Sequence, residues 1–139
     1  MESWTTVQIE ETAVVVTLPF QSSSVRTARR RLSADLRSRG VRDTGIDDAR
    51  VVLSELVANS VRHAFPLATG SLSVSWRLSD RSLVVSVSDG GSETRPRTLQ
   101  PPPNALGGRG LAIVETLSEH WWVEQGATGT TVFAAISLS

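Results

Sequence analysis

The chain has 139 residues, of which 40% are hydrophobic and 20% are charged. These proportions are ordinary for a folded globular protein, and the length favours one domain with its own core. The basic and acidic residues cancel, so net charge gives no support to a nucleic-acid or membrane-surface role. The chain has no cysteine, which excludes disulfides and thiolate metal sites. We find neither an apolar run of the roughly 18 residues that a membrane span needs nor a secretory signal pattern, and we expect a cytoplasmic protein.

The N-terminal region predicts strand structure followed by a helix. Residues 5–18 are apolar and rich in β-branched side chains, which favours one or two strands. A serine among positions 22–24 can cap a helix that runs to about Arg39, and Gly40 is suited to end it. The residues expected to bury this helix recur at helical spacing: Val25, Ala28, Leu32 and Leu36.

A second helix is expected from Asp43 or Thr44 up to Pro66, which cannot continue it. Glu55 and Asn59 lie one turn apart on this helix and project from the same face. A carboxylate and a carboxamide so placed can hold a divalent metal through oxygen and orient or deprotonate a nucleophile. The same spacing also suits an ordinary solvated face. The neighbouring face is apolar and predicts burial of Ile46, Ala49, Leu53, Leu56, Val57, Ser60 and Ala64.

The C-terminal half predicts four strands and one more helix. A tight turn at Asp80-Arg81 joins the first two strands as a hairpin. The proline-rich stretch 92–104 is long for a loop in a compact domain, and such loops are usually functional or mobile. This order of elements predicts an α+β two-layer sandwich in which helices cover one face of a mostly antiparallel sheet. The expected strands are 72–78, 83–87, 120–124 and 130–136, and the expected helix is 109–118.

Two glycine-bearing segments follow the second helix. Asp89-Gly90-Gly91 comes directly after a predicted strand, where it could be a simple turn. It could also be a ligand site, in which Asp89 accepts a hydrogen bond from an exocyclic amine and Gly91 lets the backbone pass close to a flat ring. Gly107-Gly108-Arg109-Gly110 precedes a helix, where free N–H groups favour phosphate. It is not a P-loop, because no Gly-Lys-Ser/Thr follows, and no strand leads into it as a Rossmann fingerprint requires.

With these three motifs in this order, the chain resembles the ATP-binding domain shared by gyrase-type ATPases, Hsp90 chaperones, histidine kinases and MutL, the GHKL superfamily. It is most similar to the bacterial anti-sigma-factor serine/threonine kinases. The resemblance implies a Bergerat-type fold with three helices on one face of the sheet. It also implies a single histidine-kinase-like domain over residues 1–139, with an ATP lid at about 92–106.

The resemblance also implies roles for individual residues. Glu55 resembles the general base, and Asn59 resembles the Mg²⁺ ligand. Asp89 resembles the aspartate that reads the adenine amino group, with Gly91 beside the ring. Arg109 is a candidate for stabilising the transferring phosphate. The other positions that the resemblance places around the nucleotide are His63, Gly108, Gly110, Leu111 and Thr130.

The implied function is a protein kinase that uses ATP and Mg²⁺. It would phosphorylate an anti-sigma-factor antagonist on serine or threonine and bind a sigma factor, with a homodimer possible and no direct contact to nucleic acid or membrane. Two alternatives stay open. One is a non-catalytic module whose ATP sets the shape of a partner-binding surface, and the other is a structural domain in which the glycines only form turns.

Two further features have a plain and a functional interpretation. Arginines gather in and just after the first helix, where they form either a solvated face or a docking surface for an acidic partner: Arg26, Arg29, Arg30, Arg31, Arg37, Arg39 and Arg42. Trp121 and Trp122 must point to opposite faces of a strand. One of them could therefore mark an interface, or simply pack at an edge.

Overall fold

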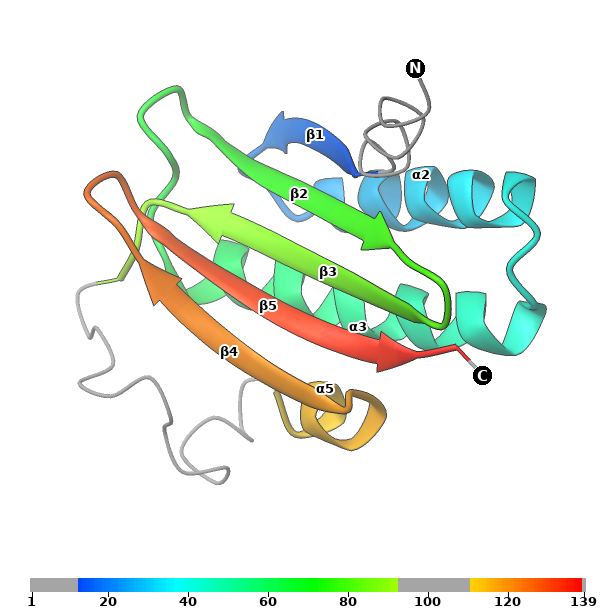
Figure 1. Cartoon of the computed structure of the whole chain (residues 1–139). Coiled ribbons are helices and arrows are strands. Elements are labelled where there is room, and N and C mark those ends of the chain that lie inside the picture. The colour runs from blue at the N-terminus through cyan, green and yellow to red at the C-terminus, as the bar shows by residue number, and fades with distance from the viewer. Residues whose placement is uncertain (1–12, 93–110, 139) are drawn as a thin grey trace, which may run out of the picture.

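Within the described residues, five antiparallel strands form one sheet, and three helices cover one of its faces (Figure 1). The structure is a computed structural model, and it describes residues 13–92 and 111–138. The sheet order is β1-β2-β3-β5-β4. The predicted α+β sandwich is therefore confirmed. The elements are β1 (Val14–Pro19), α2 (Ser24–Ser38), α3 (Asp43–His63), β2 (Ser71–Leu78), β3 (Ser82–Asp89), α5 (Leu111–Leu117), β4 (His120–Gln125) and β5 (Thr130–Ser137).

β1 covers the C-terminal part of the region in which the sequence predicts one or two strands. β1 begins at Val14, and residues 5–12 of the expected strand region lie outside the described part of the chain. Its side chains alternate, so that Val16 and Leu18 are buried under the helices while Val15 is 68% exposed on the opposite face. β1 pairs only with β2 in the described chain and therefore forms one edge of the sheet.

α2 ends as predicted but begins differently. Gly40 has a φ of +85°, and two backbone bonds close the helix in a Schellman arrangement, Gly40 N–H to Arg37 O and Val41 N–H to Leu36 O. The expectation of a serine cap at the start is wrong, because Ser23 stands at the N-cap without a side-chain capping bond. The Ser24 hydroxyl instead donates to Pro19 O at 2.6 Å, which ties the helix start to the end of β1.

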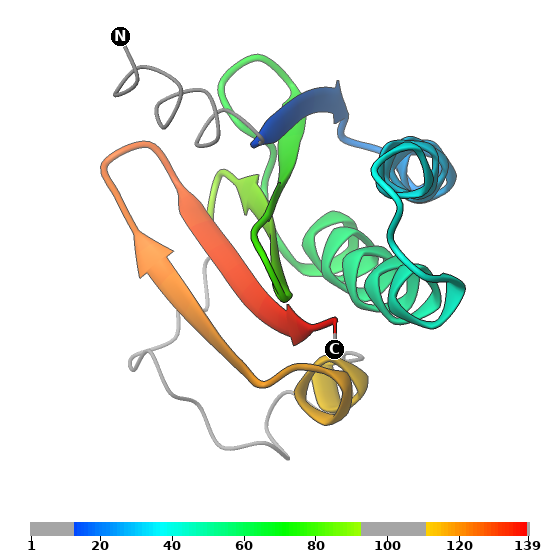
Figure 2. The same cartoon turned by 45° about the vertical axis from the view of Figure 1, so that its right-hand side comes forward.

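Figure 2 shows the sheet and the helix layer facing each other, and the core lies between them. α3 is the central helix and packs against both α2 and α5 as well as against β3. The apolar stripes predicted for α2 and α3 are buried here, apart from Val25 and Ala64, which are half-buried. The largest fully buried side chains include Trp76, Leu32, Leu36, Ile46, Leu53, Leu72, Leu83 and Ile136. In the described residues, no helix is long and apolar enough to cross a membrane.

The strand order brings the end of β3 against the start of β5. β3 pairs with β5 rather than with β4, and in this register Asp89 lies opposite Thr130. A two-residue turn at Asp80-Arg81 joins β2 to β3, closed by Ser79 N–H to Ser82 O at 2.9 Å. The two expected hairpins are thus present. Their arrangement places the Asp-Gly-Gly segment beside the first residue of a strand that lies 41 positions later.

Trp121 and Trp122 point to opposite faces of β4, as predicted. Trp121 packs against the core from the helix side. Trp122 lies on the open face of the sheet, where it stacks on Phe133 with ring centroids 5.0 Å apart and on His120 at 5.1 Å. Both tryptophans are half-buried.

Candidate functional site

The Asp89 carboxylate is buried and held at both oxygens. Its side chain lies at the last position of β3, and the residue is 6% exposed. Oδ1 accepts a hydrogen bond from the Gly91 N–H at 2.8 Å, and Oδ2 accepts one from the Ser60 hydroxyl at 2.5 Å. Burial raises the pKa of the Asp89 carboxyl above its usual range, and the two hydrogen bonds oppose that rise without cancelling it.

Ser60 joins this carboxylate to α3. It follows Asn59 directly and is 5% exposed. The helical pattern predicted burial of Ser60 but no role in the site, because a serine on an apolar face reads as a small core residue. Only the fold brings it to Asp89, which is 29 positions away in the sequence. Ser60 is therefore a site residue that the sequence alone does not reveal.

A short backbone pairing also fixes the Asp-Gly-Gly turn to the chain after α3. Gly90 N–H donates to Phe65 O at 2.7 Å, and Phe65 N–H donates to Gly91 O at 2.7 Å. Gly91 has a φ of +92°, a conformation that glycine adopts without strain. Two backbone hydrogen bonds therefore hold the turn in place, and the Gly91 N–H also donates to one carboxylate oxygen of Asp89.

Thr130 and Gly129 complete the wall beside Asp89. Thr130 is the register partner of Asp89, and its Oγ1 lies within van der Waals range, 3.4 Å, of the position that a side chain on Gly91 would take. At Gly129, an added Cβ would lie 2.0 Å from Asp89 O, so only glycine fits. The predicted grouping of Asp89, Gly91 and Thr130 is found in the structure, and Gly129 joins it.

Glu55 and Asn59 stand on α3 one turn apart, and both are half-buried. The Asn59 Oδ1 atom is buried and has no hydrogen-bond partner within the described residues. Such an acceptor is costly unless it is satisfied, and an amide oxygen suits Mg²⁺, which prefers oxygen ligands. The described residues hold no group of three or more His, Asp or Glu that could bind a metal by themselves. These side chains fit a cation that takes most of its remaining ligands from water and phosphate.

Comparison with known proteins identifies the family. Residues 18–136 match the histidine kinase-like ATPase domain. The chain belongs to the histidine kinase-like ATPase family. Serine-protein kinases RsbW of Listeria innocua and Listeria monocytogenes are 30% identical to it over an alignment of 118 residues that covers 76% of this chain and 75% of theirs.

Solved structures with the same fold include two that cover most of this chain. The RsbU and RsbW domains of Rv1364c from Mycobacterium tuberculosis match with a TM-score of 0.68 and 27% identity. The match covers 90% of this chain but only 32% of that longer chain. The SiaB-SiaC complex from Pseudomonas aeruginosa matches with a TM-score of 0.68 over 97% of this chain and 94% of the other, at 14% identity, which speaks for the fold alone.

Other predicted site residues of this histidine kinase-like ATPase domain are less tightly grouped. His63 is the last residue of α3 and is exposed. Leu111 begins α5 and is buried in the core, and the second glycine segment, behind which it is predicted to pack, lies outside the described residues. Gly108, Arg109 and Gly110, and residues 93–106 of the predicted lid, lie outside the described residues.

A cavity of about 250 Å³ opens beside Asp89, on the rim formed by the β4–β5 turn. Its wall includes Ser88, Glu124 and Thr131 as well as Asp89 and Thr130. Neither Glu55 nor Asn59 lines it. In the described part of this ATPase domain, the cavity and the Glu55 carboxylate are thus two separate features, and the Ser60–Asp89 hydrogen bond joins α3 to the end of β3.

Proposed function

We propose that the chain is an ATP-dependent serine/threonine protein kinase that phosphorylates an anti-sigma-factor antagonist and thereby regulates a sigma factor in the cytoplasm. The family and the similarity to RsbW serine-protein kinases support ATP use and a kinase-type activity. The antagonist and the sigma factor are the partners that this resemblance implies.

The observation that carries the proposal is the Ser60–Asp89 hydrogen bond. It connects the carboxylate suited to an adenine amine with the helix that bears Glu55 and Asn59. Each oxygen of Asp89 has accepted one hydrogen bond and retains further acceptor capacity, which an exocyclic amine can use. One rigid unit can thus position the base of a nucleotide relative to a catalytic carboxylate.

In the proposed reaction the protein forms no covalent bond to the substrate, and it acts by positioning groups and stabilising charge. Glu55 would accept the proton of the attacking serine or threonine hydroxyl as the phosphoryl group transfers. Asn59 would hold Mg²⁺, which when bound offsets phosphate charge. The oxygen of Asn59 is suited to this role because it is buried and unpartnered among the described residues.

A non-catalytic ATP-binding module is the second candidate. It has the same requirements at Asp89, Ser60 and Gly91, but it makes no use of Glu55 as a base. A test must therefore separate nucleotide binding from phosphoryl transfer, and two single substitutions on this chain do so.

We would measure ATP·Mg²⁺ binding by calorimetry and transfer of labelled phosphate to purified candidate antagonists, using the wild type, Glu55→Gln and Asp89→Asn. The kinase proposal predicts that Glu55→Gln lowers transfer by about 10²–10⁴-fold, the range typical of a positioned base, while binding stays within a few-fold of wild type. Asp89→Asn should weaken binding itself, because an amide donor would face the adenine amine.

If Glu55→Gln transferred phosphate as fast as the wild type, the assignment of Glu55 as the base would be overturned. ATP binding without transfer to any antagonist, in wild type and variant alike, would favour the non-catalytic module. Failure of the wild type to bind ATP at millimolar concentration would contradict both candidates.

A further inference from the structure

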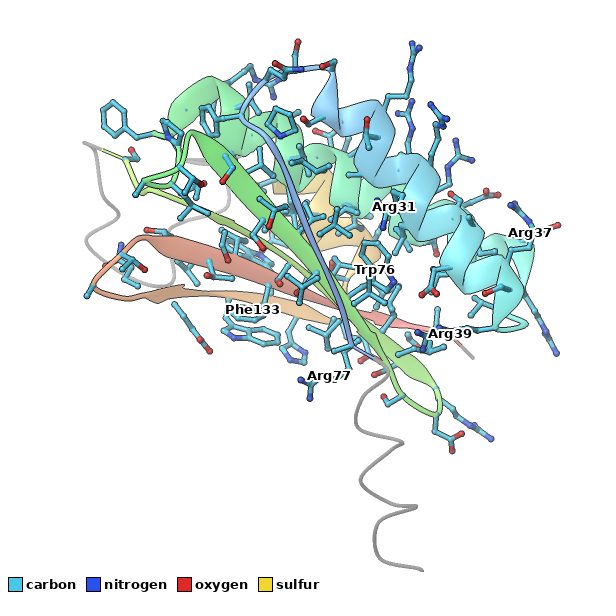
Figure 3. The ribbon with its side chains drawn as sticks, turned by 90° about the horizontal axis from the view of Figure 1, so that it is seen from above. Arg31, Arg37, Arg39, Trp76, Arg77 and Phe133 are labelled. Carbon is cyan, nitrogen blue, oxygen red and sulfur yellow. The ribbon has the colours of Figure 1, made fainter. Side chains whose placement is uncertain are left out.

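A larger hollow lies far from Asp89, between α2 and the edge strand β1. Its volume is about 690 Å³, and Arg30, Arg31 and Asp35 of α2 line it together with Val14 of β1 and Trp76 of β2. Figure 3 shows Arg31 on α2 near Trp76 at this edge. We call this hollow the β1 groove. Its helix side is polar and charged, and its sheet side is apolar.

The free charge in the β1 groove is positive. Arg30 and Arg31 are exposed, and neither forms an ion pair within the described residues. Among the described residues that line the groove, Asp35 is the one carboxylate, and it is already occupied, because it accepts a hydrogen bond from the Trp76 indole N–H at 2.8 Å and pairs with Arg39 at 3.1 Å. Two guanidinium groups are therefore left to bind an anion that enters from solvent.

The strand beside the groove has an edge suited to pairing. β1 reads Val-Val-Val-Thr-Leu-Pro, so it carries no charged side chain that would discourage another strand. The opposite edge strand, β4, has Glu124 on its outer face and a bulky stack of His120 on Trp122. An exposed, uncharged, β-branched edge is the kind that receives an added strand.

We propose that the β1 groove receives an extended acidic segment of a partner protein. The segment pairs its backbone with the edge of β1 that has no partner strand among the described residues, and it extends the sheet. Side chains of a strand alternate between the two faces, so every second residue of the segment points toward α2. Carboxylates at those positions meet Arg30 and Arg31, and apolar side chains between them continue the open face of the sheet past Val15.

This surface is distinct from the proposed nucleotide site and does not depend on it. Trp76 lies opposite Val85 in the sheet, four residues from Asp89 along β3. At about 3.3 Å per residue, the groove and the Asp89 carboxylate are separated by more than ten ångströms along the strand alone. A failed kinase assay would therefore leave the docking proposal intact. Failure of the acidic peptide to bind would likewise leave the proposed kinase function intact.

The test uses a fluorescently labelled, acetylated peptide of alternating glutamate and valine, titrated with the full chain and followed by anisotropy. We expect saturable binding and backbone amide shifts confined to β1 and α2 in NMR spectra. Arg30→Glu combined with Arg31→Glu should weaken binding by about tenfold or more, because two attractions become repulsions. Arg37→Glu, an exposed change on the same helix outside the groove, should leave it within about twofold.

Two matched peptides test the strand pairing and the charge. A glutamate–valine peptide that is N-methylated along one edge keeps its charge but cannot form backbone hydrogen bonds with β1. A lysine–valine peptide keeps the alternating pattern but reverses the charge. Neither peptide should bind. Equal binding by either peptide, an unchanged affinity in the double variant, or no binding at millimolar peptide would overturn the proposal. Binding seen only after removal of residues 1–12 would also overturn it, by showing that the chain's own segment takes the groove.

Discussion

The Ser60 hydroxyl is the contact on which the geometry of the Asp89 carboxylate depends. Asp89 is almost fully buried, and its ionised form needs hydrogen-bond donors to offset the loss of water. Ser60 supplies one of the two donors within the described residues, at 2.5 Å, and Gly91 supplies the other. The carboxylate therefore keeps a fixed orientation before any ligand arrives, which lowers the cost of ordering it on binding.

We expect Ser60→Ala to destabilise the fold by about 1–3 kcal/mol, the usual cost of leaving a buried acceptor with one partner fewer. It should also weaken ATP binding, because Asp89 loses its orientation. Urea unfolding and calorimetric titration would measure the two effects separately.

Ser54→Ala is the matched control for this prediction. Ser54 lies on the same helix and is also buried, but its hydroxyl has no hydrogen-bond partner in the described residues. Its removal should cost little, because no bond is lost. Equal losses in the two variants would show that the Ser60 contact carries no special weight.

The sequence reveals which side chains suit a binding site better than it reveals which distant residues contact each other. Glu55 and Asn59 are four positions apart, so helical geometry alone predicts that they share a face. Ser60 and Asp89 are 29 positions apart, and nothing local to either one predicts their bond. Periodicity placed Ser60 in the core correctly, but it cannot say which buried group a core serine meets.

At the scale of elements, the β4–β5 hairpin forms one wall of the candidate site. Its turn is closed by Gly126 N–H to Gly129 O at 2.8 Å, and it sets β5 against the end of β3. Gly129 allows that contact, since the backbone of Asp89 occupies the space that a side chain would need. The hairpin position and the Asp89 position are therefore coupled through backbone atoms, which cannot move aside as a flexible side chain could.

Gly129→Ala should destabilise the protein by about 1–3 kcal/mol or more, as overpacking does, and should weaken nucleotide binding through the displaced Asp89. Gly126→Ala is the control in the same turn, because an added Cβ there meets no atom within 4 Å. Thermal unfolding and ATP titration of both variants would check this. A Gly126→Ala effect as large as that of Gly129→Ala would contradict the steric explanation.

The elements themselves were largely predictable, and the reasons are physical. Apolar stripes with a period near 3.6 identified α2 and α3, and alternation identified β2 and its hairpin partner β3. The serine cap of α2 was wrong because Ser23, at the N-cap, has helical backbone angles (φ −65°, ψ −17°), and its hydroxyl oxygen accepts a hydrogen bond from the Gln21 side chain instead of from the helix backbone. The insertion of β5 between β3 and β4 was beyond sequence reasoning, because strand order depends on long-range pairing and leaves no local pattern.

At the scale of the whole molecule, the sheet separates two surfaces with different chemistry. One end of β3 carries the Asp89 carboxylate and its glycine-rich surroundings, which suit a nucleotide. The outer edge carries β1 and the arginines of α2, which suit an acidic strand. α3 lies between α2 and α5 in the helix layer and is buried along much of its length. A rigid core of this kind holds both surfaces in place and leaves each free to bind alone.

We therefore expect the two surfaces to bind independently. Arg30→Glu combined with Arg31→Glu should leave the affinity for ATP·Mg²⁺ within about twofold of wild type, because charges beyond about 8 Å are largely screened at physiological salt. Asp89→Asn should likewise leave the affinity for the acidic peptide unchanged. Titrating each ligand in the presence and absence of the other would measure the coupling directly. A change of about fivefold or more, equal in both directions as linkage requires, would show instead that β1 and the end of β3 move together, and that the core between them has two arrangements rather than one.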